Sequence, residues 1–123
     1  MSKYGAKKVT RDGMTFDSIK EFRRWNELNL LQRGGKIQDL QRQVKFVLIP
    51  KQYERYERYS QKTGKRLADG MRVLEKEVSY IADFVYIQDG KRIVEDVKGY
   101  RTAEYKLKRK MMLYFHGIQI KET

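Results

Sequence analysis

Two aspartates and a lysine occupy matching positions in a predicted β-hairpin. Strongly β-prone runs flank Asp89-Gly90, a pair that favours two-residue type I′ turns. With that turn, Asp83 faces Asp96 across the hairpin, and Lys98 projects from the same face as Asp96. Facing like charges destabilise a sheet by up to about 1 kcal/mol. A cation between the two carboxylates would remove this repulsion, and a pair of oxygen ligands with open positions suits Mg²⁺ or Mn²⁺.

The same register separates two neighbouring acids. Glu95 faces Phe84 on the opposite side of the sheet, so we expect Glu95 to pair with a basic helix residue or with solvent. A slip of one residue would exchange the positions of Glu95 and Asp96. The competing structural interpretation is a buried salt bridge between Asp83 and Lys98, with Asp96 near solvent at the end of its strand.

A third acid, Glu21, lies in the first turn of a helix predicted over residues 18–33. Ser18 with Glu21 three residues later matches a capping box, which by itself would account for the glutamate. At about 100° per residue, however, Trp25 and Leu28 fall within about 40° of Glu21 on the apolar arc of this helix. We therefore favour a role for Glu21 on the side of the helix that faces the sheet.

The remaining N-terminal half supplies further elements. Residues 1–17 are basic and polar with Asp-Gly at positions 12 and 13, which predicts a small hairpin or an arm. Two extended segments are predicted at 36–39 and 44–49. Residues 51–72, rich in Tyr, Arg and Lys, predict an exposed insertion, either a loop or a long irregular hairpin. That segment would stack on or wrap nucleic acid, or serve only as a solubilising loop.

The C-terminal half completes the order αβββαβ. A strand is predicted from 73 to 88, and a second helix is predicted from the N-cap Thr102 to about Phe115, with Leu107, Met111 and Phe115 on one face. His116, the only histidine, is expected to interact with the dipole at the end of this helix. A short strand is predicted at 118–120.

The central hairpin is apolar on both faces, which suits a sheet covered by helices on both sides. The sequence therefore predicts an α/β fold in which a central mixed sheet lies inside a three-layer α/β/α arrangement. At 123 residues we expect one domain over 1–123.

The net charge of +12 favours a polyanionic partner. Nucleic acid is the simplest such partner, and its binding would weaken steeply with salt; a merely solvated basic surface is the alternative. The chain has no cysteine, which excludes disulfides, thiolate zinc sites and a cysteine nucleophile. No apolar run approaches the length of about 20 residues that a membrane span needs, and no signal peptide is evident. We expect a soluble protein that is not exported.

These acids and elements together resemble the PD-(D/E)xK nuclease superfamily, which has the restriction-endonuclease-like fold. Ala82 replaces the proline of the superfamily name, at a position known to vary. More narrowly, the chain is similar to an uncharacterised group of small bacteriophage proteins placed in that superfamily. The similarity spans nearly the whole chain and is carried by Phe16-Asp17-Ser18-x-x-Glu21, Tyr80-Ile81-Ala82-Asp83-Phe84, Glu95-Asp96-Val97-Lys98-Gly99 and Tyr105-Lys106-x-Lys108.

The resemblance implies a Mg²⁺- or Mn²⁺-dependent endonuclease that acts on DNA. Asp83 and Asp96 would hold one or two metal ions together with the Val97 carbonyl, and Glu21 would contribute directly or through water. Lys98 would orient or help deprotonate the attacking water and offset charge on the phosphate. No small-molecule cofactor is implied.

Basic residues follow the D-x-K strand and continue along the second predicted helix, where they would bind phosphates. For each of them an ordinary solvated helix face is the alternative. The resemblance adds Tyr105 and gives most support to Lys106. The candidate DNA contacts are Arg101, Tyr105, Lys106, Lys108, Arg109 and Lys110.

We therefore predict a metal-dependent endonuclease, with a non-catalytic basic nucleic-acid-binding protein as the alternative. A helical Glu with D…D-x-K in so short a chain is similar to junction-resolving enzymes, which act as dimers. By this analogy alone, branched DNA and a homodimer are expected. If the chain is a phage protein, as the resemblance suggests, it would act in the cytoplasm of a bacterial host.

Overall fold

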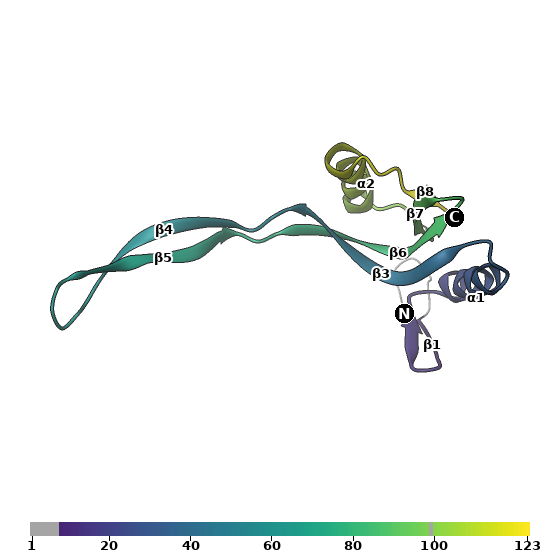
Figure 1. Ribbon diagram of the computed structural model, residues 1–123, viewed down its shortest axis with the longest axis horizontal. Helices are drawn as coiled ribbons and strands as arrows, with labels where there is room; N and C mark the ends of the chain where they lie inside the picture. Colours follow the sequence, from purple (N-terminus) through teal and green to yellow (C-terminus); the bar gives the residue numbers. More distant parts are fainter. Residues whose placement is uncertain (1–7, 99) are drawn as a thin grey trace. The chain divides into compact units, whose positions relative to one another are not determined.

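The computed structural model describes residues 8–98 and 100–123 as an α/β chain with two helices and mostly strands (Figure 1). Of the predicted arm over 1–17, residues 1–7 lie outside the described part. The elements are β1 (Val9–Arg11), β2 (Met14–Phe16), α1 (Ile19–Arg33), β3 (Gln38–Ile49), β4 (Gln52–Tyr59), β5 (Arg66–Glu75), β6 (Val78–Gln88), β7 (Lys91–Asp96), α2 (Ala103–His116) and β8 (Lys121–Glu122).

The chain divides into two compact units. The first comprises Met1–Phe46 and Tyr80–Thr123, and the second comprises Val47–Ser79. From the sequence we expect one domain with an exposed insertion over 51–72, and this segment lies within the second unit. Each unit is described separately below.

In the first unit, the N-terminal hairpin and α1 form as their local signals predict. β1 and β2 pair antiparallel around Asp12 and Gly13, both of which have positive φ. Ser18 caps α1 by accepting a hydrogen bond from the Glu21 backbone N–H, and Gly34 ends the helix. The predicted helix over 18–33 is therefore confirmed.

The main sheet of this unit has the strand order β3-β6-β7-β8. β6 and β7 are antiparallel and turn at Asp89 and Gly90, whose φ values are 51° and 74°. Gln88 pairs with Lys91 and Phe84 pairs with Glu95, so the predicted register is confirmed. β7 and β8 are parallel, which makes the sheet mixed, as predicted.

The strand β3 differs from the prediction. Two extended segments at 36–39 and 44–49 are expected from the sequence, but one strand spans Gln38–Ile49. Asp39 and Gln43 adopt left-handed backbone conformations inside it, with φ of 53° and 55°. Left-handed residues within a strand are typical of bulges, which bend a strand without ending it.

The hydrophobic core lies between α1 and the sheet. Leu28 of α1 packs with Ile37, Phe84 and Tyr86, and all four are almost fully buried. The Trp25 indole stacks on the Phe84 ring with 6.0 Å between centroids. Burying a Leu or Phe side chain stabilises a fold by about 1.5–3 kcal/mol, so this contact holds α1 against β6.

A buried ionic network lies beside this core. Glu95 is fully buried, and its carboxylate accepts hydrogen bonds from Arg24 Nε (2.6 Å) and Nη2 (2.9 Å), Tyr86 Oη (2.6 Å) and Thr123 Oγ1 (3.2 Å). Burial raises the pKa of Glu95, but the hydrogen bonds from Arg24 and Tyr86 outweigh burial, and the pKa is lowered overall. The prediction that Glu95 pairs with a basic helix residue is confirmed.

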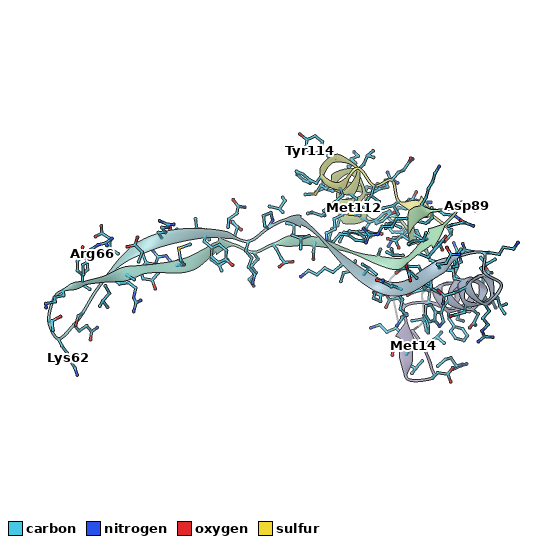
Figure 2. The ribbon with its side chains drawn as sticks, in the orientation of Figure 1. Met14, Lys62, Arg66, Asp89, Met112 and Tyr114 are labelled. Carbon is cyan, nitrogen blue, oxygen red and sulfur yellow. The ribbon has the colours of Figure 1, made fainter. Side chains whose placement is uncertain are left out.

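α2 begins after the N-cap Thr102 and ends at Gly117, which is left-handed. The predicted apolar face of this helix is wrong: Leu107 and Phe115 are exposed, while Tyr105 and Met112 are buried. Figure 2 shows Met112 on the side of α2 nearer the sheet and Tyr114 pointing away from it. The buried face differs from the predicted one because the side chains of Tyr105 and of Met112, two turns further along α2, fill the space between the helix and the sheet.

The ends of α2 and of the chain also differ in detail from expectation. His116 is the last residue of α2, as expected, and its ring lies edge-on to Phe46 with 6.0 Å between centroids. The final strand is Lys121–Glu122 rather than 118–120. Ile120, which lies in the predicted strand, is instead a buried residue that immediately precedes β8.

The second unit contains the antiparallel hairpin of β4 and β5. The sequence predicts a strand from 73 to 88, but it is divided between β5 and β6, which are separated by residues 76 and 77. Gly70 is the one position of the hairpin where glycine is required by space, because a Cβ there would lie 2.3 Å from the Tyr56 ring. Tyr56 therefore packs flat across the backbone of the facing strand.

Neither helix in the described residues is long and apolar enough to cross a membrane.

Candidate active site

Asp96, the last residue of β7, is buried between a tyrosine and a lysine. Its Oδ2 accepts a hydrogen bond of 2.5 Å from Tyr80 Oη, and its Oδ1 lies 3.1 Å from Lys98 Nζ. Oδ1 is buried and accepts no hydrogen bond from the described residues, so the Lys98 ammonium is the cation that offsets its charge. A buried carboxylate is costly unless it is paired or bound to a metal ion.

Asp83 of β6 lies beside Asp96, as the register predicts. Its Oδ2 accepts a hydrogen bond of 2.8 Å from the Val97 backbone N–H. Burial raises the pKa of Asp83 to about 9, and the adjacent Asp96 carboxyl adds to the increase both by hydrogen bonding and by charge repulsion. In the absence of a metal ion, Asp83 therefore holds a proton near neutral pH.

The competing interpretation, a salt bridge from Asp83 to Lys98 with Asp96 near solvent, is not what the structure has. Lys98 pairs with Asp96, and Asp96 is the more buried of the two acids. The environment of Asp83 is also less apolar than predicted, since Ile81 is exposed on the same strand while Val85 is buried.

Contacts to both the backbone and the side chain hold Lys98 in place. Its N–H donates to the Thr123 carbonyl (3.1 Å), and its carbonyl accepts from Lys20 Nζ (3.3 Å). Its ammonium lies 4.4 Å from the centroid of the Tyr105 ring, a cation–π contact. The ammonium group is thereby held next to Asp96.

Glu21 is buried and reaches back to the backbone before the helix, but to Asp17 rather than to the Ser18 N–H that the predicted capping box requires. Its Oε2 accepts a hydrogen bond from the Asp17 backbone N–H, and its Oε1 accepts one from Gln43 Nε2, both of 3.1 Å. Burial raises the pKa of Glu21. Its charge is close enough to Asp83 to raise the pKa of that residue too, so the third acid lies near the first two without joining their hydrogen bonds.

Gln43 is a site residue that the sequence does not reveal. It adopts a left-handed backbone conformation within β3, and this conformation directs its amide to Glu21. A non-glycine residue in this region costs roughly 1–2 kcal/mol. Arg42, next to it, lies 3.8 Å from Glu21 Oε1 and stacks on the Phe16 ring. No motif in the sequence marks either residue.

The predicted DNA contacts fall into two groups. Lys106 and Lys110 are exposed on α2, whereas Lys108 forms an ion pair with Glu104 (3.1 Å). Arg101, Tyr105 and Arg109 converge on Glu122, at 3.0, 2.7 and 3.3 Å. Tyr105 is buried, and its ring lies against Lys98 and Tyr80.

Glu122 is a second residue that the sequence prediction misses. It pairs with Asp96 across the parallel strands β7 and β8, and paired residues share a face of the sheet. The hydrogen bonds from Tyr105 and Arg101 overcome the effect of burial and lower its pKa. Placing the last strand at 118–120 hid this pairing, because the predicted strand ended before Glu122.

The donor set fits a divalent ion that keeps several waters. Within the described ranges, no three acidic or histidine side chains converge closely enough to enclose a metal ion. Mg²⁺ is commonly held by one or two carboxylates, with waters and substrate phosphate completing the octahedron. Such an ion would replace the proton on Asp83 and would take Asp96 Oδ1, which accepts no hydrogen bond within the described residues, as a ligand.

One family model matches residues 1–122, and that family is described as a protein of unknown function (DUF1064). No curated protein and no solved structure matches the chain.

Proposed function

The chain belongs to this family of proteins of unknown function, and we propose that it is a Mg²⁺-dependent endonuclease that hydrolyses phosphodiester bonds in DNA. The observation that carries the proposal is the half-buried Asp83 beside the buried Asp96, with Lys98 at 3.1 Å from Asp96. A purely structural ion pair would need only one acid beside Lys98. Metal-dependent hydrolysis of a phosphodiester uses the second carboxylate as well, because Mg²⁺ is commonly held by one or two carboxylates.

We also propose a three-layer, restriction-endonuclease-like core for the first unit. Two contacts support it. Leu28 of α1 packs with Phe84 and Tyr86, whereas Tyr105 of α2 contacts Tyr80 and Lys98, which both bond to Asp96. Glu95 and Asp96 are consecutive on β7 and point to opposite faces, so the helices would cover opposite sides of the sheet.

In this proposal the metal site is made by Asp83, Asp96 and the Val97 carbonyl, with Glu21 contributing directly or through water. A bound Mg²⁺ or Mn²⁺ would activate water and stabilise the leaving oxygen. Lys98 would hold the attacking water and offset charge on the phosphate. Tyr80, by donating to Asp96 Oδ2, leaves Oδ1 as the free ligand oxygen.

Around this site, Lys106 and Lys110 are the exposed cations of α2 that would bind DNA phosphates. Arg101 and Arg109 would also bind phosphates. Both form ion pairs with Glu122, which holds their guanidinium groups in place. Lys108 would first have to leave Glu104. Selectivity for branched DNA, a homodimer and a cytoplasmic location remain expectations by analogy.

A non-catalytic, basic nucleic-acid-binding protein is the second candidate. Its support is the net charge of +12 together with the ion pairs that already occupy Asp96 and Glu122. The two candidates differ in one respect, because only the first requires a metal ion at Asp83 and Asp96.

The test is a cleavage assay on duplex, single-stranded and four-way-junction DNA, with Mg²⁺, with Mn²⁺ and with EDTA. We expect metal-dependent cleavage by the native chain, and DNA binding without cleavage by Asp96→Asn. If neither protein cleaves any substrate while both bind DNA, the nuclease proposal fails and the non-catalytic candidate is favoured.

Gln43 offers a second test, because it touches the proposed site through Glu21 alone. Gln43→Gly removes the amide but suits the left-handed backbone, so we expect the free energy of unfolding to stay within about 1 kcal/mol of native. Loss of a partner that orients a metal ligand typically costs about tenfold or more in metal affinity, and we expect that loss here by calorimetric Mg²⁺ titration.

The matched control for Gln43→Gly is Asp39→Gly, which makes the same backbone change at the other left-handed residue of β3. Asp39→Gly should leave Mg²⁺ affinity unchanged. Equal weakening by both variants would mean that β3 geometry, and not the Gln43 amide, controls the site.

A further inference from the structure

The β4–β5 hairpin has two faces of different character, and residues that pair across an antiparallel ladder share a face. We define the packed face as Glu54, Tyr56, Gly70 and Arg72. The tyrosine face comprises Tyr53, Arg55, Tyr59, Met71 and Val73, by the pairs Tyr53 with Val73 and Arg55 with Met71 and by alternation along β4.

The side chains of the packed face contact one another. Arg72 forms an ion pair with Glu54, and its guanidinium lies 5.0 Å from the centroid of the Tyr56 ring. That ring in turn covers Gly70, which is buried as a result. These contacts tie the two strands together across one side, although Tyr56 itself remains 39% exposed.

The tyrosine face is open. Tyr53, Tyr59, Met71 and Val73 are exposed by 51, 54, 56 and 46%. Glu57 lies on the same side and accepts a hydrogen bond from Tyr59 Oη (2.7 Å). A two-stranded hairpin is at best marginally stable in water unless a further element covers it, so an aligned row of exposed aromatic and apolar side chains calls for a partner.

The charge around this face identifies the chemistry of that partner. The second unit has eight basic and five acidic residues, and Glu54 and Asp69 are already paired with Arg72 and Arg66. Arg55 and the loop residues Lys62 and Lys65 are exposed and form no ion pair within the described residues. Figure 2 shows Lys62 at the loop end of the hairpin. The uncompensated charge is positive.

We propose that the tyrosine face of the β4–β5 hairpin is a DNA-binding surface. Arg55, Lys62 and Lys65 bind backbone phosphates, and Tyr53 and Tyr59 contact sugars and bases. A two-stranded β-ribbon fits the major groove of duplex DNA, and tyrosine rings stack on the bases of single-stranded DNA without sequence preference. The proposal rests on the proposed function only in taking DNA as the ligand; it needs no metal ion and no catalytic residue.

The test measures the affinity for a fluorescein-labelled DNA duplex and a labelled four-way junction by anisotropy, between about 50 and 200 mM salt. The variant combines Arg55→Gln, Lys62→Gln and Lys65→Gln. Each phosphate contact contributes about one to the slope of log affinity against log salt. We expect the slope to fall by about three and the affinity at low salt to fall by about tenfold or more.

A variant with the same charge loss is the control. Arg33, Lys36 and Lys91 are exposed residues of the first unit, and their joint change to Gln should alter the slope by less than about one. An equal effect of both triple variants would mean that binding depends on net charge alone, and this would overturn the proposal. An unchanged salt slope in the hairpin variant would overturn it as well. Thermal melting of all proteins establishes that they are folded.

One matched pair tests the face itself. Arg55 and Arg58 are both exposed on β4, but alternation places Arg58 on the side of the packed face. Arg55→Gln should weaken binding severalfold more than Arg58→Gln, and equal effects would overturn the assignment of the face. Because these readouts are of binding, failure of the nuclease proposal appears separately, as native protein that binds but does not cleave.

Discussion

Asp83→Asn is expected to abolish metal-dependent DNA cleavage while making the metal-free protein more stable at alkaline pH. In the proposed nuclease, the loss of one of the two metal-binding carboxylates would remove several kcal/mol of transition-state stabilisation. At about 1.4 kcal/mol for each factor of ten, the rate should fall by about a thousandfold. The asparagine retains an oxygen for the hydrogen bond from Val97 N–H, so the local fold should persist.

The stability effect follows from the raised pKa of Asp83. The carboxyl ionises near pH 4 in the unfolded chain but near pH 9 in the folded protein. Between these values the folded state holds a proton that the unfolded state has released, so the free energy of unfolding of the native chain decreases as pH rises. Asparagine cannot ionise, so Asp83→Asn should remove this decrease and add about 1–3 kcal/mol at about pH 8.

Urea unfolding at about pH 5 and about pH 8, with and without Mg²⁺, measures both parts of this expectation. In the native chain Mg²⁺ should stabilise the fold at the higher pH, where it replaces the proton on Asp83, and much less at the lower pH. In Asp83→Asn that pH-dependent stabilisation should disappear. A native chain whose stability rises from pH 5 to 8 without metal would contradict the raised pKa of Asp83.

Arg24→Ala should cause the largest loss of stability of any single change at the surface of α1. Arg24 provides two of the hydrogen bonds to the fully buried Glu95. Removing one partner of a buried ion pair costs about 3–5 kcal/mol, because it leaves an uncompensated charge. Urea denaturation at neutral pH should show this loss. The loss should be smaller at about pH 5, because Glu95 of the variant, which no longer has a cationic partner, can accept a proton there.

The control for Arg24→Ala is Glu27→Gln. Glu27 also pairs with Arg24, at 2.9 Å, but its side chain is 63% exposed, so the change should cost less than about 0.5 kcal/mol. Similar losses in both variants would show that Arg24 acts mainly through the surface pair, and the buried network would then contribute little.

The sequence predicts most of the candidate site because the register of β6 and β7 is set by the turn between them. Asp89 and Gly90 supply the two positive φ angles of the turn, and this turn fixes which acids face one another. The same register separates Glu95, which pairs with Arg24, from Asp96, which pairs with Lys98. The caps at Ser18 and Thr102 fix both helix starts for the same reason, since a cap requires only neighbouring residues.

What the sequence does not predict depends on contacts between distant segments. Gln43 reaches Glu21 only because β3 bends, and left-handed residues other than glycine carry no clear mark in a sequence. Glu122 joins the site through parallel pairing with β7, which no turn connects. The buried face of α2 is set by Tyr80 and Phe46 on the strands below it, so helical periodicity alone selects the wrong residues.

The two faces of the β4–β5 hairpin also bear on how such a ribbon can change length during evolution. Side chains alternate between faces with a period of two, so adding or removing one residue in each strand moves the outer tyrosines to the other side. Changes by two residues in each strand, about 6.8 Å of ribbon, keep Tyr53 and Tyr59 together. The register shifts at Gln52/Tyr53 and Tyr56/Arg58 show how a single extra residue is absorbed without that inversion. Relatives of this chain should therefore carry hairpins that differ in length by even steps or by compensating bulges.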